Sequence, residues 1–262
     1  MKIIRPYSRL LVPWAMEERN QALITARAMG FIEWCGRISH RSEEARTEDS
    51  WRRFIQNVVL DHGDWSIVEH VTASVDSITD RGITHESVRH RLFSYTQEST
   101  RFVNYEKKMP LAFIYPIVGV ECVHCLRGNE PFPVNYVLDT WKHRDESSDL
   151  IDCLYEPAWL KGRAEDENEY KILVTSVKQG GKGWRPQEAR SCLPNALASR
   201  IITTGNLRNW RHLFIMRTTG EAHPQMRQVT IPLLNEFKEA FPLLFDDIEP
   251  NSRQIENLRK PR

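Results

Sequence analysis

The chain has little cysteine, no excess of either charge and no long apolar run. Five cysteines among 262 residues are too few, and odd in number, for the disulfide framework of a secreted domain. The 36 Lys and Arg nearly cancel the 35 Asp and Glu, so no global field draws the chain to nucleic acid or anionic lipid. No run reaches transmembrane length, and MKIIRPYSRLLVPW lacks the apolar core of a signal peptide. We therefore expect a soluble, cytoplasmic protein without nucleic-acid or membrane partners.

Two common ligand-binding motifs are also missing. No G-x-G-x-x-G fingerprint is present, and the glycines of GGKG (180–183) lack the frame of a phosphate-binding loop. Cys122 and Cys125 form a C-x-x-C pair around His124, but no second pair stands at the spacing of a zinc site. We expect no metal site.

Apolar periodicity divides the first 110 residues into helices and strands. It predicts helices over 15–38 and from Thr47 to about His62, the second opened by acidic residues near its positive end. The β-branched run 68–79 indicates a strand, 81–92 a helix, and 99–105 a further strand.

The middle of the chain is less regular than its ends. Residues 115–185 contain prolines, a charged stretch and glycines, and we expect helices there at about 134–143 and 150–178. After it come a helix from Pro186, a strand in ASRIITTG, a helix in NLRNWRHLFIMR, and a long helix over 222–245 interrupted near Pro232.

This order favours an α+β fold, a β-sheet core flanked by long helices, because strands and helices do not alternate as in βαβ units. We expect one domain over 1–250, with 115–185 as an inserted region and 251–262 as a C-terminal tail.

The segment RHRLFSYTQESTR (89–101) concentrates cations in a nearly neutral chain. Neighbouring residues of a helix face different ways, so Arg89, His90 and Arg91 at a helix end would reach separate groups. Gln97, Ser99 and Arg101 alternate, so on an extended segment they would share one face. An amide, a hydroxyl and a guanidinium together suit a ligand with a phosphate and a base edge. A solvated basic turn is the alternative.

The same segment resembles the signature of flavin-dependent thymidylate synthases, the ThyX family. R-H-R is followed after seven residues by Ser99 and then Arg101, SIVEHV lies upstream, and EARSCLP and TTGNLRNWRHLFIMR follow in the family's order. The resemblance covers about 35–110 and 185–245.

It implies an α+β enzyme that methylates dUMP to dTMP. Methylenetetrahydrofolate would be the carbon donor, and FAD reduced by NADPH the hydride source, without an enzyme nucleophile. It also implies a homotetramer whose subunits share active sites, and a flavin held without a Rossmann fingerprint.

The resemblance assigns two sets of ligand residues. The FAD contacts would be Ser39, Ser66, Glu69, Arg89, His90, Arg91, Leu92, Asn206 and His212. The dUMP contacts would be Glu86, Gln97, Ser99, Thr100, Arg101, Arg190 and Arg217. Ser99 and Arg101 would bind the phosphate. Arg217 would be the catalytic residue, stabilising negative charge that develops on the uracil.

Three positions depart from the pattern. Gln97 stands where many members have Glu, and Asp64 where some have a His beside the flavin. Glu86 stands where some have Gln, and a carboxylate beside a phosphate is unfavourable unless it is paired. Ser99 has no adjacent base in sequence, so we interpret it as a positioning residue, and Cys192 as a packing residue.

Two other functions stay open on the sequence alone. One is a related flavin-dependent dUMP methylase or hydroxymethylase on the same scaffold. The other is a nucleic-acid-binding module that uses Arg89–Arg91 against phosphates, which the absence of a basic stripe disfavours.

Overall fold

A computed structural model of the chain describes residues 2–4, 6–12, 20–108, 111–115, 142–144, 150–152, 157–176 and 183–259. The chain forms two compact units. The first comprises residues 1–6, 79–84 and 97–199, and the second comprises 7–78, 85–96 and 200–262. Each unit is described by itself.

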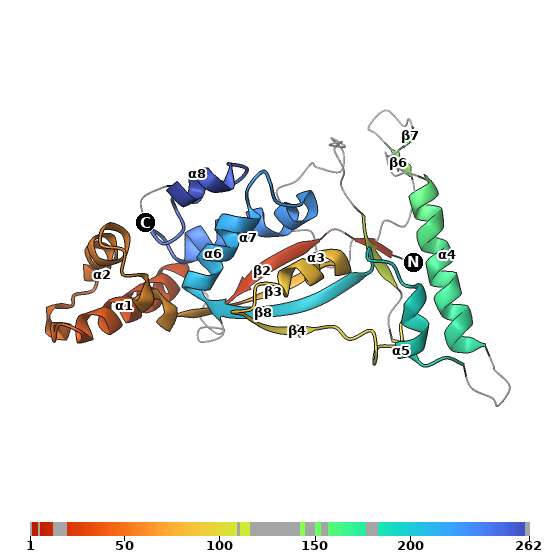
Figure 1. Ribbon diagram of the computed structural model, residues 1–262, viewed down its shortest axis with the longest axis horizontal. Helices are drawn as coiled ribbons and strands as arrows, with labels where there is room; N and C mark the ends of the chain where they lie inside the picture. The colour runs from red at the N-terminus through yellow and green to blue at the C-terminus, as the bar shows by residue number, and fades with distance from the viewer. Residues whose placement is uncertain are drawn as a thin grey trace. The chain divides into compact units, whose positions relative to one another are not determined.

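A four-stranded sheet lies mainly in the second unit, with the strand order β2-β3-β8-β4 (Figure 1). The strands are β2 (Tyr7–Leu11), β3 (Thr72–Asp80), β8 (Ala198–Asn206) and β4 (Ser94–Gln97). β2 runs antiparallel to β3, with Tyr7 opposite Ile78 and Leu11 opposite Ser74. The long central strands are made by the β-branched runs that the sequence singles out.

A buried carboxylate joins three strands of this sheet. Asp76 on β3 is fully buried, and Arg200 on β8 binds it in a bidentate pair, with Nε and Nη2 at 2.8 and 2.7 Å from its two oxygens. Arg9 on β2 lies 3.6 Å away. A buried charge is tolerated when it is paired and hydrogen-bonded, as here.

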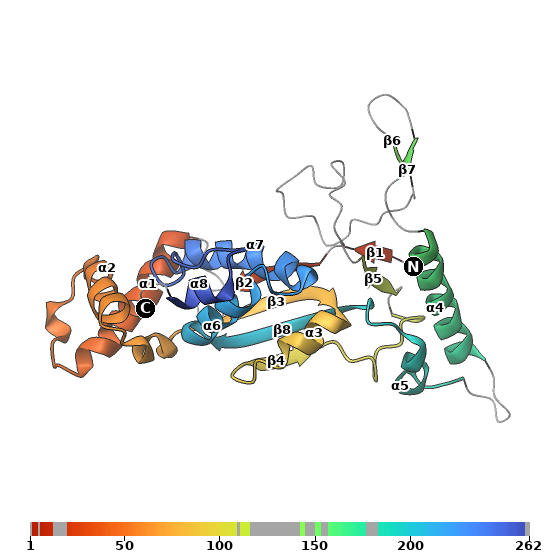
Figure 2. The same cartoon turned by 45° about the horizontal axis from the view of Figure 1, so that its top comes forward.

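Helices cover the sheet of the second unit (Figure 2). α7 (Pro224–Ala240) packs on β2, where Ser8 Oγ donates to the carbonyl of Val229 and Leu10 N–H donates to Glu236 at 2.6 Å. α6 (Leu207–Arg217) follows β8 directly. The core between them is aromatic, with Trp210, Phe214, Phe237, Phe241 and Phe245 in mutual contact.

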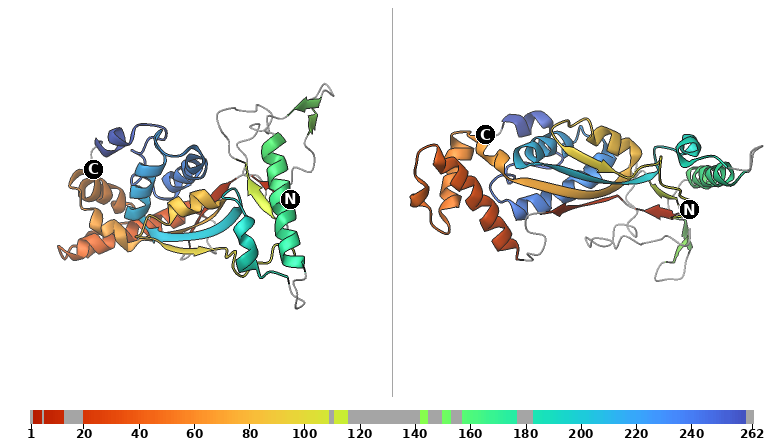
Figure 3. Two further views of the ribbon diagram at one scale, coloured as in Figure 1. Left: turned by 45° about the vertical axis from the view of Figure 1, so that its right-hand side comes forward. Right: turned by 90° about the horizontal axis from the view of Figure 1, so that it is seen from below.

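The N-terminal helices of this unit are tied together by another buried acid. α1 (Gln21–Ile38), capped by Asn20, and α2 (Ser50–Phe54) lie side by side (Figure 3). Glu33 is fully buried and accepts hydrogen bonds from Arg37 and from Ser50 Oγ at 2.7 Å. α2 continues as a π-helical turn (Ile55–Asp61), and short 3-10 helices occupy Glu43–Ala45 and Trp65–His70.

The first unit has its own smaller core. β1 (Lys2–Ile4) pairs in parallel with β5 (Ala112–Ile114), and β6 (Lys142–Arg144) pairs antiparallel with β7 (Leu150–Asp152). α4 (Pro157–Thr175) packs beside α5 (Pro186–Ala189), which continues as a 3-10 turn, Arg190–Cys192 (Figure 3). The buried residues of this smaller core are Tyr105, Leu111, Phe113, Tyr170, Ala189 and Leu197.

Several local expectations are wrong. α3 (Arg81–Ser87) ends before Arg89, so the RHR triplet lies in a turn and not in a helix. Residues 99–105 form turns instead of a strand. α7 continues through Pro232 without a break.

In the predicted inserted region 115–185, one of the two predicted helices forms in part. α4 forms within the predicted helix 150–178, but β7 occupies its start. Residues 134–141 of the other predicted helix lie outside the described residues, and 142–144 form β6. None of the described helices is long and apolar enough to cross a bilayer.

Candidate active site

Helix α6 presents three of the predicted ligand residues in the second unit. Asn206 ends β8 and caps the helix, its side-chain oxygen accepting from Asn209 N–H at 2.9 Å. His212 is exposed one turn further on, and Arg217 lies in the last turn. β8 and α6 form one continuous path (Figure 1), so the sheet fixes where the helix begins.

Arg217 contacts the RHR turn directly. Its Nε donates to His90 Nε2 at 3.0 Å, which joins residues 127 positions apart in the chain. Its Nη1 lies 3.5 Å from Glu86 Oε2 in an ion pair. The pairing that a carboxylate at position 86 requires is therefore supplied by Arg217. The residue predicted to act on the pyrimidine thus lies beside a residue predicted to contact the flavin.

His90 is held as a neutral acceptor. Burial, followed by the positive charges of Arg217 and His212, lowers the pKa of His90 from 6.5 to about 4. A neutral imidazole has one nitrogen without a proton, and the Arg217 N–H points at it. The His90 and His212 rings are 6.4 Å apart. Near neutral pH the cationic charge of this group therefore resides on the arginine.

Two residues that the sequence reasoning missed shape the turn. The hydroxyl of Tyr95 lies 2.7 and 2.8 Å from the carbonyl oxygens of Ser87 and His90, and burial raises the pKa of Tyr95 to about 12. Asn209 Nδ2 donates to the Leu92 carbonyl at 3.0 Å, which ties the turn to α6. The position of Asn209 three residues after Asn206, on the first turn of α6, was the only sequence signal.

Gly205 explains how closely the turn approaches the sheet. A Cβ at this position would come 2.4 Å from the ring of Phe93, a contact that no real Cβ makes. Phe93 also packs edge-on against Trp210, with ring centroids 4.8 Å apart. The glycine before Asn206 therefore has a packing role beside the turn.

The remaining predicted flavin residues are spread over the second unit. Ser39 caps the end of α1 and donates to the Gly36 carbonyl at 2.8 Å. Ser66 and Glu69 lie in the 3-10 helix before β3, so the strand predicted from residue 68 begins only at Thr72. Glu69 forms an ion pair with Arg208 of α6 at 2.6 Å. Asp64 is exposed at the start of that 3-10 helix.

The exposed part of the RHR turn has the chemistry of a flavin dinucleotide site. Arg89, Arg91 and Leu92 are exposed, and the Leu92 side chain is 75% accessible. Guanidinium groups suit a pyrophosphate, and an exposed apolar side chain suits a planar ring. The residues present therefore fit FAD.

The first unit gathers most of the predicted dUMP contacts. Arg190 Nη1 donates to Thr100 Oγ1 at 3.2 Å, and Thr100 is buried. Ser99 Oγ accepts the backbone N–H of Arg101 at 3.3 Å, so the serine organises a turn. Arg101 and Arg190 are both exposed.

Gln97 is held at the edge of this group. Its Nε2 donates to Thr84 Oγ1 at 2.9 Å and to Ser199 Oγ at 3.0 Å. These bonds fix the amide orientation and engage its donors. Because residues 99–105 are not a strand, the expected one-sided alternation of Gln97, Ser99 and Arg101 is wrong, although Ser99 and Arg101 stay together through their turn.

The first-unit cysteine near this group is not activated. Cys192 Sγ donates to the Ala189 carbonyl at 3.2 Å, and burial raises the pKa of its thiol. A raised pKa disfavours the thiolate that a nucleophile needs. Among the described residues, no group of three His, Cys, Asp or Glu is placed to hold a metal ion. Cys122 and Cys125 lie outside the described residues.

The comparisons with known proteins identify the family. Residues 22–243 match the model of the Thy1 family, described as thymidylate synthase complementing protein. The chain belongs to the flavin-dependent thymidylate synthase family. A relative from Corynebacterium diphtheriae with the name flavin-dependent thymidylate synthase is 31% identical over 225 residues, covering 83% of this chain and 78% of the relative.

Solved structures of flavin-dependent thymidylate synthase and of a methylase share the fold. ThyX from Helicobacter pylori, solved with FAD and dUMP, covers 94% of this chain and 99% of its own, with 16% identity and a TM-score of 0.59. PolB from Streptomyces cacaoi, a UMP/dUMP methylase solved with 5-Br dUMP, covers 94% and 96%, with 19% identity and a TM-score of 0.62. The predicted α+β fold is confirmed.

Proposed function

We propose that this chain converts dUMP to dTMP by reductive methylation, using methylenetetrahydrofolate as carbon donor and FAD reduced by NADPH. The single observation that carries the proposal is the 3.0 Å hydrogen bond from Arg217 to His90. It joins a residue assigned to the pyrimidine with a residue assigned to the flavin, on a chain that belongs to the family.

Reduced FAD supplies the hydride when it is bound. Arg89 and Arg91 would hold its pyrophosphate, because both guanidiniums are exposed on the turn that Tyr95 and Asn209 brace. His90 stays neutral, so it leaves Arg217 as the cation of this group. The backbone of the turn is fixed by these contacts, and the two guanidiniums would orient the flavin from it.

Arg217 would stabilise negative charge on a uracil carbonyl oxygen while the pyrimidine reacts. A fixed cation aimed at the point where charge develops favours the transition state over the ground state. Glu86 holds the guanidinium from the other side, which restricts its rotation. Burial raises the pKa of the Cys192 thiol, so this cysteine of the described residues is a poor candidate for an enzyme nucleophile.

Arg190, Arg101 and Ser99 would bind the nucleotide phosphate. Thr100 positions Arg190, and the turn at Ser99 presents Arg101. We further propose a cytoplasmic homotetramer with shared active sites. In such an assembly, the first-unit and second-unit residues of one site need not come from the same chain.

The test is the absorbance spectrum of the protein reconstituted with FAD, followed by titration with dUMP. We expect a bound flavin whose spectrum shifts when dUMP is added, and dTMP formation when methylenetetrahydrofolate and NADPH follow. The Arg217→Gln variant should retain flavin and lose most of the dUMP-induced shift. A protein that takes up no FAD would overturn the proposal.

A second candidate activity is a related flavin-dependent pyrimidine nucleotide methylase or hydroxymethylase. The fold is shared with PolB as well as with ThyX, so the fold does not select the acceptor nucleotide. Mass spectrometry of the products from dUMP and UMP separates these activities. The family assignment disfavours the nucleic-acid-binding module.

A further inference from the structure

The chain continues beyond the family match, and this continuation is folded. The match ends at residue 243, whereas residues 244–259 pack onto α6 and α7. We name residues 244–259 the C-terminal brace. Its last element, α8 (Gln254–Arg259), lies against α6 (Figure 2).

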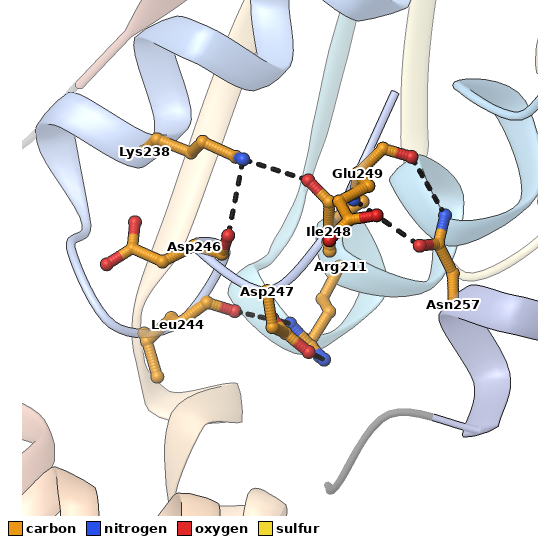
Figure 4. Close-up of polar contacts among 8 residues, drawn as sticks. All are labelled: Arg211, Lys238, Leu244, Asp246, Asp247, Ile248, Glu249 and Asn257. Atoms are coloured by element: carbon orange, nitrogen blue, oxygen red, sulfur yellow. Dashed lines mark hydrogen bonds and ion pairs between the residues drawn. The ribbon is translucent and has the colours of Figure 1, made fainter. Parts of the chain in front are cut away.

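A buried arginine anchors the start of the brace (Figure 4). Arg211 of α6 donates to the Leu244 carbonyl at 2.7 Å and grips both carboxylate oxygens of Asp247 at 2.6 and 2.5 Å. Its guanidinium also lies over the ring of Trp65, 4.6 Å from the centroid. Arg211 is only 8% exposed, so this clamp is shielded from water.

Two further side chains fix the middle of the brace (Figure 4). Lys238 of α7 donates to the Ile248 carbonyl at 2.8 Å. Asn257, which is buried, exchanges hydrogen bonds with the backbone of Glu249 at 3.3 and 3.2 Å. The brace therefore has a defined path between its two ends.

The brace then grips the turn that follows Arg217. Asn251 N–H donates to the Thr218 carbonyl at 2.8 Å, and Gly220 N–H donates to the Ser252 carbonyl at 2.9 Å. Arg227 Nη1 donates to Asn251 Oδ1 at 2.9 Å. Asn251 has a φ of 61°, in the left-handed region that asparagine tolerates better than most residues.

These bonds satisfy the end of α6, the helix that carries Arg217. The last carbonyl groups of a helix have no partner within it. Here Thr230 Oγ1 donates to the Arg217 carbonyl at 2.8 Å, and the brace takes the next one, on Thr218. A helix end that is bonded in this way frays less, so Arg217 keeps its direction toward His90.

We propose that the C-terminal brace is the positioning element of Arg217, and that Asn251 is its key residue. The expected effect on dUMP rests on the proposed function, whereas the effect on Arg217 and His90 does not. Asn251→Ala removes the side-chain acceptor for Arg227. Alanine also tolerates a positive φ less well than asparagine, so the substitution strains the backbone of the brace. Asn251→Asp is the matched control, because it keeps an acceptor oxygen and tolerates the same backbone conformation.

The test compares the two variants with the wild-type chain by three readouts. We expect Asn251→Ala to speed amide hydrogen exchange at Gly220 at least tenfold and to raise the pKa of His90, measured by NMR, as Arg217 moves away. It should raise the dissociation constant of dUMP three- to tenfold and leave FAD affinity within twofold. Asn251→Asp should match the wild type in all three readouts.

A second variant protects the test against misfolding. Gly220→Ala places a Cβ 3.2 Å from the Asn251 carbonyl oxygen, so the brace backbone must shift by a few tenths of an ångström without a change in any brace residue. In a folded protein we expect this variant to raise the pKa of His90 and the dissociation constant of dUMP in the same direction as Asn251→Ala.

The outcomes separate the two proposals. Faster Gly220 exchange with an unchanged His90 pKa would show a loose turn that leaves Arg217 in place, and would overturn the brace proposal. Unchanged exchange would overturn it too. A changed exchange and pKa in a protein that never binds dUMP would support the brace and refute the proposed function.

Discussion

The two groups of predicted ligand residues differ in how firmly their cations are held. In the second unit Arg217 is bonded to His90 and paired with Glu86. In the first unit Arg101 and Arg190 are exposed, and the Arg190 guanidinium donates to the Thr100 hydroxyl. Among the predicted ligand cations, Arg217 is therefore held by the fold, whereas Arg101 and Arg190 are exposed, as are Arg89 and Arg91 of the second unit.

This difference agrees with the roles proposed above, phosphate binding for Arg101 and Arg190 and action on the pyrimidine for Arg217. Ordering a long side chain on binding costs conformational entropy, of the order of 1 kcal/mol for each one. A phosphate contact tolerates that cost because it contributes affinity. A group that acts on the transition state has to be in place beforehand, because reorganisation during the reaction would raise the barrier. Arg217, which His90 and Glu86 hold in place, suits the second role.

The largest expected effect comes from Arg217→Gln. Removing a preorganised charge from the reacting pyrimidine should lower kcat by about 10²–10³-fold, with a smaller rise in KM for dUMP. Steady-state kinetics of dTMP formation measures both. Arg53→Gln, at an exposed arginine on α2, is the control and should leave both constants unchanged. A fall in kcat below tenfold would place Arg217 among the ordinary binding contacts.

Asp76→Asn tests whether the fold that orders the second unit depends on its buried carboxylate. Asn keeps the shape but loses the charge that holds Arg200 and Arg9. We expect a loss of about 2–3 kcal/mol in the free energy of unfolding, measured by urea denaturation.

The first unit offers a matched change for this test. Tyr105→Phe removes a hydroxyl that donates to Glu98 at 2.7 Å, and should cost about 1 kcal/mol. If both variants lose the same free energy of unfolding, the buried charge of Asp76 contributes no more than the Tyr105 hydroxyl does.

The sequence was informative where a local pattern decides the structure. β8, α6 and the end of α1 follow from β-branched runs and apolar periodicity, whereas α1 begins at Gln21 and not at residue 15. The candidate ligand residues come from the resemblance to a family motif with fixed spacing, and the family match covers most of that region. None of these patterns shows which side chains touch, so the contact between Arg217 and His90 was not predicted.

The errors come from local hydrogen bonds and tertiary packing that periodicity does not register. Residues 99–105 contain β-forming side chains, but Ser99 accepts from Arg101 N–H, and its carbonyl accepts from Phe102 and Val103 N–H, which closes a turn. Pro232 should break a helix at a cost of about 3 kcal/mol. Its neighbours Leu233 and Leu234 are buried in the core, and their packing keeps α7 continuous.

Arg190→Gln should have a smaller effect than Arg217→Gln, and on a different constant. Loss of an exposed phosphate contact is expected to raise KM for dUMP about tenfold with kcat changed less than twofold. Salt should raise the wild-type KM more than that of the variant, because exposed charges are screened. Lys107→Gln, at an exposed lysine of the same unit, is the control. A kcat effect as large as that of Arg217 would mean that the two groups do not divide binding and catalysis.

The last prediction concerns the pH dependence of His90. Its pKa is about 4 in the folded chain, against an ordinary value of 6.5, so the unfolded chain takes up the proton first as pH falls. Stability should therefore be constant above about pH 6.5 for this group and decline between 6.5 and 4. Urea unfolding of the wild type and of His90→Asn at pH 7.5, 5.5 and about 4.5 isolates the contribution, because other groups titrate in both proteins.

Arg217→Gln sharpens this last measurement. Burial is the main cause of the depressed pKa and the Arg217 charge the second, so the variant should recover part of the shift and not all of it. An NMR titration of the His90 ring reads the value directly. A ring that titrates near 6.5 in the wild type would mean that it is protonated in mildly acidic solution. A protonated ring could no longer accept the hydrogen bond from Arg217, so His90 would not hold Arg217 in place.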